Sequence, residues 1–374
     1  MEEKRISRRS FVKLAGTALA VAALPGCGFA AENLNEGKTA QTPAAAKNGD
    51  TYVPYNERQG NESVVYFTRD LSAAGLLKIY DRVSQDLSGK VAVKLHTGEP
   101  HGPNIIPRPW VKKLLADRLP EAHIIETNTY YNGGRYTTED HRKTLAVNGW
   151  TEFATVDITD EAGTAMLPVP GGKWFQEMSV GKNMLNYDSL LALTHFKGHT
   201  MGGFGGSNKN LGIGCADGRI GKKMIHSGDS GQQWGITQEE FMERMTESTK
   251  ATVHHFAGKI AFINVMRNMS VDCDCAGTGA APVVTPDVGI VASLDILAAD
   301  QASVDLIYAL PEKSKHALVE RMESRHSMRQ LSYMKELDMG NDRYQLVDID
   351  NNDQIIDAQT AVQGINGTWA GERI

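Results

Sequence analysis

Apolar residues along the chain form short unbroken runs that alternate with longer stretches of helical spacing. Short runs are typical of buried strands, whereas apolar side chains three or four positions apart are typical of one face of a helix. Strands are therefore predicted at residues 64–67, 90–95, 122–127, 155–157, 189–193, 259–265 and 288–293. Helices are predicted at residues 71–87, 107–119, 138–147, 237–256, 296–310 and 311–337, and a closing hairpin at residues 344–356.

This alternation predicts an α/β fold with a largely parallel sheet and flanking helices, a Rossmann-like three-layer architecture that could divide into two lobes. In such sheets, ligands bind beyond the carboxyl ends of the strands. The polar segments that follow the strands should therefore converge. The convergence would bring together seven polar side chains: Lys94, His96, Asn128, Arg135, His195, Lys197 and His199.

Residues 194–215 form the most unusual segment, with two histidines, two lysines, one cysteine and seven glycines. Glycine lets the backbone approach a ligand closely, and lysine and histidine supply charge, proton transfer and metal ligation. We interpret the segment as a glycine-rich functional loop, the alternative being an ordinary surface loop. Its candidate catalytic residues are His195, Lys197 and His199. Lys94, His96, Asn128, Arg135, Lys209 and Asn210 are candidates for binding a substrate or cofactor.

Three cysteines lie downstream of residue 200, namely Cys215, Cys273 and Cys275. A disulfide within a C-x-C pair is strained, whereas two neighbouring thiolates suit a soft metal. Together with His226 the three cysteines would form a Cys₃His set, a common four-coordinate arrangement. A disulfide from Cys215 to one of the pair, or free thiols, are the alternatives. The cysteine spacing of a ferredoxin module is absent from the sequence.

Residues 1–61 are predicted to serve export rather than to fold, with residues 1–27 as a twin-arginine signal peptide that ends in a lipobox. Arg8 and Arg9 precede an apolar run at residues 14–24, as in a twin-arginine signal, and Cys27 stands where a lipobox cysteine would be lipidated. Residues 28–61 lack an apolar period and are predicted to be a flexible linker. We expect a domain at residues 62–350, a C-terminal extension at 351–374, and a location in the periplasm or at the outer face of a membrane, held by the lipid.

Composition narrows the function classes. The 374 residues are 41% hydrophobic and 22% charged. These proportions are typical of a globular protein. The formal net charge of −6 argues against a general nucleic-acid binder.

Several motifs, in this order, resemble one family. They are Thr127-Asn128-Thr129, Gly134-Arg135, His195-x-Lys197-x-His199, Lys209-Asn210 with Gly212, Cys273-Asp274-Cys275, and Gly289–Asp295 leading to Asp300-Gln301. Over residues 62–350 the chain resembles the domain-of-unknown-function 362 family, whose members are often described as iron–sulfur-centre proteins. Many members also carry a pair of ferredoxin motifs, which this chain lacks.

A weaker resemblance is to the nickel-pincer lactate racemases, because a histidine precedes the segment Gly205–Lys209, which has one residue more than the loop of that family. That resemblance implies that His195 and His199 are acid/base residues and that Lys209 contacts a cofactor.

Together these features predict an exported protein that binds an iron–sulfur centre or another soft transition metal. Its expected activity is redox or proton-transfer chemistry on a small anionic molecule, with a redox partner. The alternatives are a non-enzymatic metal-binding or electron-transfer protein, and a scaffold with a structural zinc.

Overall fold

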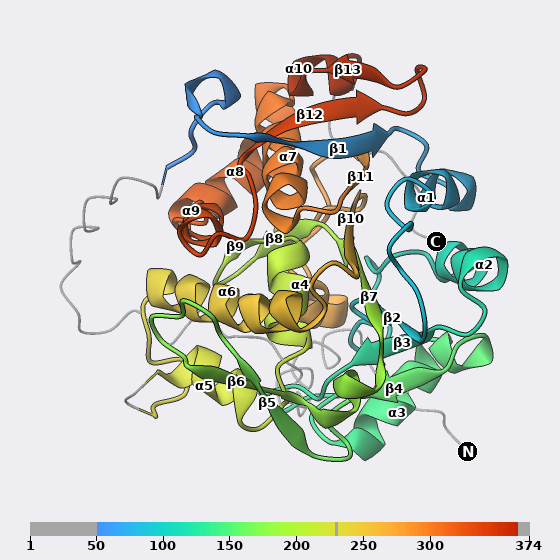
Figure 1. Cartoon of the computed structure of the whole chain (residues 1–374), viewed down its shortest axis with the longest axis vertical. Helices are drawn as coiled ribbons and strands as arrows, with labels where there is room; N and C mark the ends of the chain where they lie inside the picture. Colours follow the sequence, from blue (N-terminus) through green and yellow to red (C-terminus); the bar gives the residue numbers. More distant parts are fainter. Residues whose placement is uncertain (1–50, 229–230, 366–374) are drawn as a thin grey trace, which may run out of the picture.

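A computed structural model describes residues 51–228 and 231–365 of the chain. The predicted signal, Cys27 and most of the predicted linker lie outside the described residues. Within them, a central sheet lies between two layers of helices (Figure 1). Among the described helices, none is both long and apolar enough to cross a membrane.

The central sheet has nine strands in the order β13-β12-β1-β11-β10-β7-β2-β3-β4. Strands β4, β3, β2, β7 and β10 are mutually parallel, and β12 is parallel to β1, whereas β11 and β13 are antiparallel to their neighbours. The predicted largely parallel sheet is thus confirmed. The strands are β1 (Glu62–Thr68), β2 (Val91–Lys94), β3 (His123–Glu126), β4 (Val156–Ile158), β7 (Ser189–His195), β10 (Ile260–Met266), β11 (Gly289–Ser293), β12 (Arg343–Asp348) and β13 (Gln354–Ile356).

Two apolar cores, one on each face of the sheet, explain the three layers. Side chains alternate between the faces of a strand, so Leu190 and Ala192 of β7 enter one core while Leu191 and Leu193 enter the other. The latter core is covered by α1 (Ala73–Tyr80), α2 (Arg108–Arg118) and α3 (Thr138–Val147). The former is covered by α4 (Ser207–Gly214), α5 (Gly221–Ser227), α6 (Gln238–His255), α7 (Ile296–Ala309), α8 (Glu312–Ser324), α9 (Arg329–Glu336) and α10 (Ala358–Ala361).

The segment at residues 194–215 differs from its prediction as a loop. It contains the hairpin β8 (Lys197–His199) and β9 (Gly203–Gly205), followed by α4. The Asp300 carboxylate accepts the backbone N–H groups of Ser207 and Asn208 at 2.7 and 2.9 Å, and so caps the start of α4. At Gly212 a Cβ would lie 2.4 Å from the Met245 carbonyl oxygen, so glycine here allows close packing of α4 on α6. A helix that glycines weaken locally is thus stabilised by tertiary contacts.

One short hairpin and several 3₁₀ helices make up the rest of the described secondary structure. Residues 166–182, which carried no assignment from the sequence, form most of the hairpin of β5 (Thr164–Pro168) and β6 (Glu177–Gly181). The 3₁₀ helices are Tyr55–Glu57, Trp150–Glu152, Lys182–Asn186 and Asp274–Gly279.

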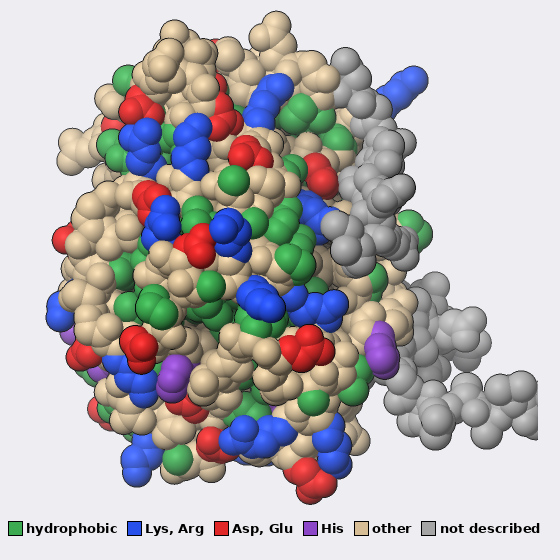
Figure 2. Space-filling view, turned by 90° about the vertical axis from the view of Figure 1, so that its right-hand side faces the viewer, with side chains coloured by type: hydrophobic (Ala, Val, Ile, Leu, Met, Phe, Trp, Pro, Cys, Tyr) green, Lys and Arg blue, Asp and Glu red, His purple; other side chains and the backbone are tan. Residues whose placement is uncertain are grey.

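The surface on the side of α1 and α2 carries basic and acidic side chains mixed together (Figure 2). Several are paired, as in the contacts Lys78–Asp350 at 2.8 Å and Arg118–Asp81 at 2.7 Å. Exposed pairs of this kind contribute about 0–1 kcal/mol each. The charges that could serve chemistry lie instead at the carboxyl ends of the strands.

Candidate metal site and its neighbouring cations

Four parallel strands deliver polar groups to one edge of the sheet. His96 follows β2, Arg135 lies in the segment after β3, His195 ends β7, and the sequence Cys273-Asp274-Cys275, here called the cysteine turn, follows β10. His96 and Arg135 approach to 3.3 Å, and His195 contacts Asp274 at 2.9 Å. The convergence expected from the topology therefore occurs for these residues.

The histidine segment, residues 195–199, runs beside the chain that leads to the cysteine turn. The Phe196 N–H donates to the Val265 carbonyl at 2.9 Å, and the Gly198 N–H donates to the Ser270 carbonyl at 2.8 Å. At Gly198 a Cβ would lie 2.2 Å from the Val271 carbonyl oxygen, so only glycine permits this approach. Because alternate residues of extended chain share a side, the His195 and Lys197 side chains reach the cysteine turn together.

Asp274 is held by two side chains from the histidine segment. Its carboxylate lies 2.9 Å from His195 Nδ1 and 3.0 Å from Lys197 Nζ. Burial opposes the charge of Asp274, but His195 and Lys197 outweigh it and hold its pKa well below the usual range. Burial likewise opposes the charge of Lys197, yet Asp274 raises the pKa of that lysine.

His195 has a second contact, on its other ring nitrogen. Its Nε2 lies 2.6 Å from the Arg267 carbonyl oxygen, while Nδ1 faces the Asp274 carboxylate. Both partners are hydrogen-bond acceptors. Both ring nitrogens of His195 are thus engaged within the fold, and the ring anchors the cysteine turn.

His199, Cys273 and Cys275 form the only group of potential metal ligands found within residues 51–228 and 231–365. One atom from each lies within 4.8 Å of the other two. His199 and Cys273 are buried, and Cys275 is partly exposed. Two sulfur atoms and one imidazole nitrogen are the donors that soft transition metals prefer.

The cysteines lie in a positive environment. Lys209 Nζ is 3.4 Å from Cys273 Sγ, and Lys209 is itself buried. A hydrogen bond from Cys275 lowers the pKa of Cys273 well below its usual value; burial opposes this shift, and Lys209 and Lys197 add to it. The same hydrogen bond raises the pKa of Cys275, so the two thiols titrate as a coupled pair in which Cys273 ionises first.

Hydrogen bonds to the His199 ring limit how it can bind a metal. Its Nδ1 accepts the Gly202 N–H at 2.9 Å and the Met201 N–H at 3.3 Å. These contacts leave the ring proton of the neutral imidazole on Nε2. Burial and neighbouring cations hold the pKa of His199 well below its usual value. Ligation through Nδ1 would use the lone pair that Gly202 needs. Ligation through Nε2 would move the ring proton to Nδ1, which could then no longer accept the Gly202 N–H. If the ring were turned over, a carbon atom instead of Nδ1 would face that N–H. Metal binding by neutral His199 therefore breaks the Gly202 hydrogen bond in every case.

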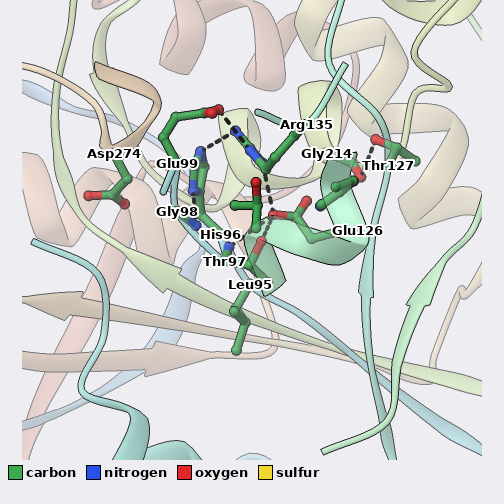
Figure 3. A network of polar contacts seen from close by, with 12 residues as sticks. Leu95, His96, Thr97, Gly98, Glu99, Glu126, Thr127, Arg135, Gly214 and Asp274 are labelled. Carbon is green, nitrogen blue, oxygen red and sulfur yellow. Dashed lines mark hydrogen bonds and ion pairs between the residues drawn. The ribbon is translucent and has the colours of Figure 1, made fainter. Parts of the chain in front are cut away.

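A second set of buried charges, here called the arginine network, consists of Lys94, Glu99, Glu126 and Arg135. Lys94 Nζ lies 3.0 Å from Glu126, and Arg135 contacts Glu99 at 2.8 Å and Glu126 at 3.3 Å. Figure 3 shows Arg135 between these two carboxylates and His96. Burial opposes the charge of Glu126, but Lys94 and Arg135 together lower its pKa. Lys94, a predicted anion-binding residue, is therefore already paired within the chain.

Two predicted ligands lie outside the cysteine group. Cys215 is packed in the apolar core, where burial raises its pKa to about 11. The His226 ring packs against Tyr130 and Trp234, and its Nδ1 lies 2.7 Å from the Lys222 carbonyl oxygen. The structure thus groups His199, rather than Cys215 and His226, with Cys273 and Cys275. Spacing along the chain could not distinguish these histidines, because the choice depends on how α4 and α5 pack.

Two predicted binding residues have structural contacts. Asn128 Nδ2 donates to Thr138 Oγ1 at 2.9 Å, which fixes the segment after β3. Asn210 Nδ2 donates to the Lys94 carbonyl and to Thr194 Oγ1, which joins β2 and β7 to α4. Their amide groups are therefore used inside the fold.

Three buried carboxylates, Glu126, Asp274 and Asp300, were not among the residues predicted for the site. Asp274 was visible as the middle residue of the C-x-C motif, and Glu126 as an acidic residue at the end of a buried strand. For Asp300 the sequence signal was its place in a motif of the resembled family, and its role at α4 could not be predicted because it lies in an apolar helix far along the chain from α4. Burial raises the pKa of Asp300 to about 6, and the N–H groups of α4 partly offset this shift.

Comparison with solved structures gives distant likenesses. The lactate racemase apoprotein from Thermoanaerobacterium thermosaccharolyticum is 10% identical, with 84% of this chain and 93% of that chain covered and a TM-score of 0.32. A protein from Thermotoga maritima is 12% identical, with 69% and 57% covered and a TM-score of 0.32. TM-scores this low carry no argument about this chain. No curated protein matches the sequence.

A family comparison is more informative. The family described as domain of unknown function (DUF362) matches residues 91–305, which is more than half of the chain. The matched range contains the arginine network, the histidine segment and the cysteine turn. The chain therefore belongs to the DUF362 family.

Proposed function

We propose that this protein binds one soft transition-metal ion through His199, Cys273 and Cys275 and acts on a small anionic molecule beside it. The grouping of these three donors within 4.8 Å carries the proposal. In the proposal, the metal would polarise a bound oxygen or exchange an electron, which are the chemistries that protein-bound transition metals supply. The reaction class is redox or proton transfer, and a redox reaction would need an electron-transfer partner.

The number of donors favours a single ion in an open site. Iron–sulfur clusters are usually held by four protein ligands, and structural zinc by four. The described residues offer three donors, which leaves one position for a substrate. This arrangement favours an enzyme over a scaffold with a structural zinc.

Lys209 is the cation best placed to stabilise negative charge at this site. Lys94 and Lys197 are ion-paired with Glu126 and Asp274, whereas the polar contact described for Lys209 Nζ is Cys273 Sγ. In the proposal, Lys209 offsets the charge of the thiolates and of the anion bound next to them. The Asp274 pairs with His195 and Lys197 would keep the cysteine turn in place around a bound metal.

The proposed setting is outside the cytoplasm. The twin arginines, the apolar run and Cys27 support export by the twin-arginine route and attachment to a membrane by a lipid. A route that carries folded proteins suits a metal site that is filled before export.

Metal analysis of matched variants tests the proposal. The full chain is matured in the cytoplasm, purified without oxygen, and its metal content and visible spectrum are measured. Wild type is expected to hold about one soft metal ion per chain, and Cys273→Ser, Cys275→Ser and His199→Gln are expected to lose most of it. Cys215→Ala and His226→Gln are the controls and should retain it. A metal-free wild type, or equal loss in the controls, would contradict the proposed site.

A further inference from the structure

His96 stands between two hydrogen-bond donors. It follows β2 at the sheet edge and is partly exposed. Its Nδ1 accepts the Gly98 N–H at 3.0 Å, and its Nε2 lies 3.3 Å from Arg135 Nη2 (Figure 3). A backbone N–H and a guanidinium can only donate.

A single imidazole cannot satisfy both contacts. The neutral ring has one lone pair and one N–H, and the charged ring has two N–H groups and no lone pair. Burial and Arg135 hold the pKa of His96 well below its usual value, so the ring is neutral. One of the two facing N–H groups therefore lacks an acceptor. An unmade hydrogen bond in a partly buried position is destabilising.

The remaining contacts of Arg135 show where an acceptor would fit. Its Nε donates to Glu99 at 2.8 Å and its Nη1 to Glu126 at 3.3 Å, so two edges of the guanidinium are used by carboxylates. Nη2 donates one proton to the Tyr131 hydroxyl at 3.0 Å. The second Nη2 proton faces His96. With Nδ1 accepting from Gly98, the His96 Nε2 proton faces the same guanidinium edge.

We propose that the His96 Nε2–H and Arg135 Nη2–H groups together bind a carboxylate of a small molecule. One oxygen would accept from each N–H, which replaces a contact between two donors by two charge-assisted hydrogen bonds. Binding requires the two side chains to separate enough to admit the carboxylate between them.

The charge around this pair accommodates one negative group. Four buried cations, Lys94, Arg135, Lys197 and Lys209, lie at this edge with three buried carboxylates, Glu99, Glu126 and Asp274. One carboxylate with a single charge suits this balance better than a phosphate with two.

The proposed carboxylate seat lies next to the cysteine turn. The charge of Asp274 acts on His96, and the charge of Arg135 acts on Cys275. A molecule whose carboxylate lies on His96 and Arg135 can thus direct the rest of its structure toward the partly exposed Cys275. The inference deepens the small-anion part of the proposed function and does not depend on the metal.

Binding of acetate to the full chain tests the seat, with acetamide as the neutral comparator of the same shape. Acetate binding is followed by the ¹⁵N signals of labelled histidine rings, with His96 assigned by the His96→Asn variant. Acetate is expected to shift the His96 signals, and acetamide is not. His96→Asn should weaken acetate binding about tenfold to a hundredfold, as expected for the loss of one hydrogen bond to a charged group.

Controls separate this inference from the metal proposal. His101→Asn changes an exposed histidine of the same segment, whose φ is positive. Asparagine tolerates a positive φ, so this variant should leave acetate binding unchanged. The titration is run with and without bound metal. Unshifted His96 signals at saturating acetate, or equal acetate affinity in His96→Asn, would overturn the seat even if the metal is present. Tighter binding of inorganic phosphate than of acetate would overturn the carboxylate assignment. A metal-free protein that binds acetate as expected would leave the seat standing and contradict the metal proposal alone.

Discussion

The arginine network and the cysteine turn are both buried sets of charged groups at one edge of the sheet, yet they differ in how their charges are balanced. In the arginine network, Lys94 and Arg135 each have a carboxylate partner within 3.0 Å. At the cysteine turn, Lys209 faces a cysteine sulfur at 3.4 Å.

The comparison distinguishes buried charges that hold the fold together from buried charges that remain for a ligand. A buried ion pair that is complete within the chain holds loops in place, because breaking it would leave a charge in a medium of low polarity. A buried cation beside thiols is balanced only when the thiols ionise or a ligand binds. The start of α4 is also balanced within the chain, because the Asp300 carboxylate already occupies the position where an external anion could have bound.

The largest expected effect concerns the buried ion pairs of the arginine network. Glu126→Gln would leave Lys94 and Arg135 without a shared carboxylate, and should lower the free energy of unfolding by about 3–5 kcal/mol. Urea unfolding of the purified variant measures the loss. The control is Glu139→Gln, whose pair with Lys143 at 2.8 Å is exposed. An exposed pair should contribute at most about 1 kcal/mol. A Glu126 variant as stable as the Glu139 variant would remove the distinction.

A smaller effect concerns His226, a buried histidine that belongs to neither the arginine network nor the cysteine turn. Burial lowers the pKa of His226 to about 4. The unfolded chain takes up a proton from its ordinary pKa of about 6.5 downward, while the folded chain does not. The stability contributed by His226 is therefore fully present above the unfolded pKa and is lost as the pH falls toward the folded pKa. Between pH 7 and pH 5 the loss is on the order of 2 kcal/mol. His226→Gln should reduce the stability difference between these two pH values, measured by urea unfolding, and exposed His316→Gln should not. An unchanged difference in His226→Gln would show that the ring is accessible to protons when folded.

The next effect concerns the contacts that hold the cysteine turn. Asp274→Asn would weaken the hold of His195 and Lys197 on the cysteine turn without changing a metal ligand. The affinity for the bound metal should fall about tenfold to a hundredfold, as is typical when a group that orients the ligands is altered. Competition with a chelator measures the affinity, and an unchanged visible spectrum would show that the same ligands are used. Asp272→Asn is the matched control, because Asp272 pairs with Arg321 at 3.0 Å instead. Equal losses in both variants would indicate a general effect on the fold.

The smallest effect follows from the His199 hydrogen bonds. Metal binding by His199 should free the Gly202 and Met201 N–H groups and speed their hydrogen exchange. A hydrogen bond contributes about 1 kcal/mol, so the change is about fivefold. Exchange at Gly198, whose N–H donates to the Ser270 carbonyl, serves as the internal reference. Bound metal with unchanged exchange at Gly202 would show that His199 is not a ligand.

Much of the fold could be predicted from local pattern. Unbroken apolar runs such as residues 189–193 and 259–265 became β7 and β10, because strands covered on both faces need apolar residues at every position. The same reasoning failed at α4. Its glycines and polar residues predict a loop, and only the Asp300 carboxylate and the packing on α6 make a helix there.

The candidate site could be predicted only in outline. Parallel topology was enough to bring the segments after β2, β3, β7 and β10 together. The pairing of side chains within that edge was not available from spacing. His199 rather than His226 joins Cys273 and Cys275, and Lys94 is bound by Glu126 rather than left for a ligand.

By itself, the sequence determined the type of sheet, the edge at which chemistry would gather, and the residue types present there. These follow from periodicity and from the direction of parallel strands, which are properties of the local chain. Only the tertiary structure decided which charges are balanced inside the protein and which remain for a ligand. That choice depends on distances of a few ångströms between segments far apart in sequence, as between Asp274 and His195, and on the strength of charge interactions in a buried environment.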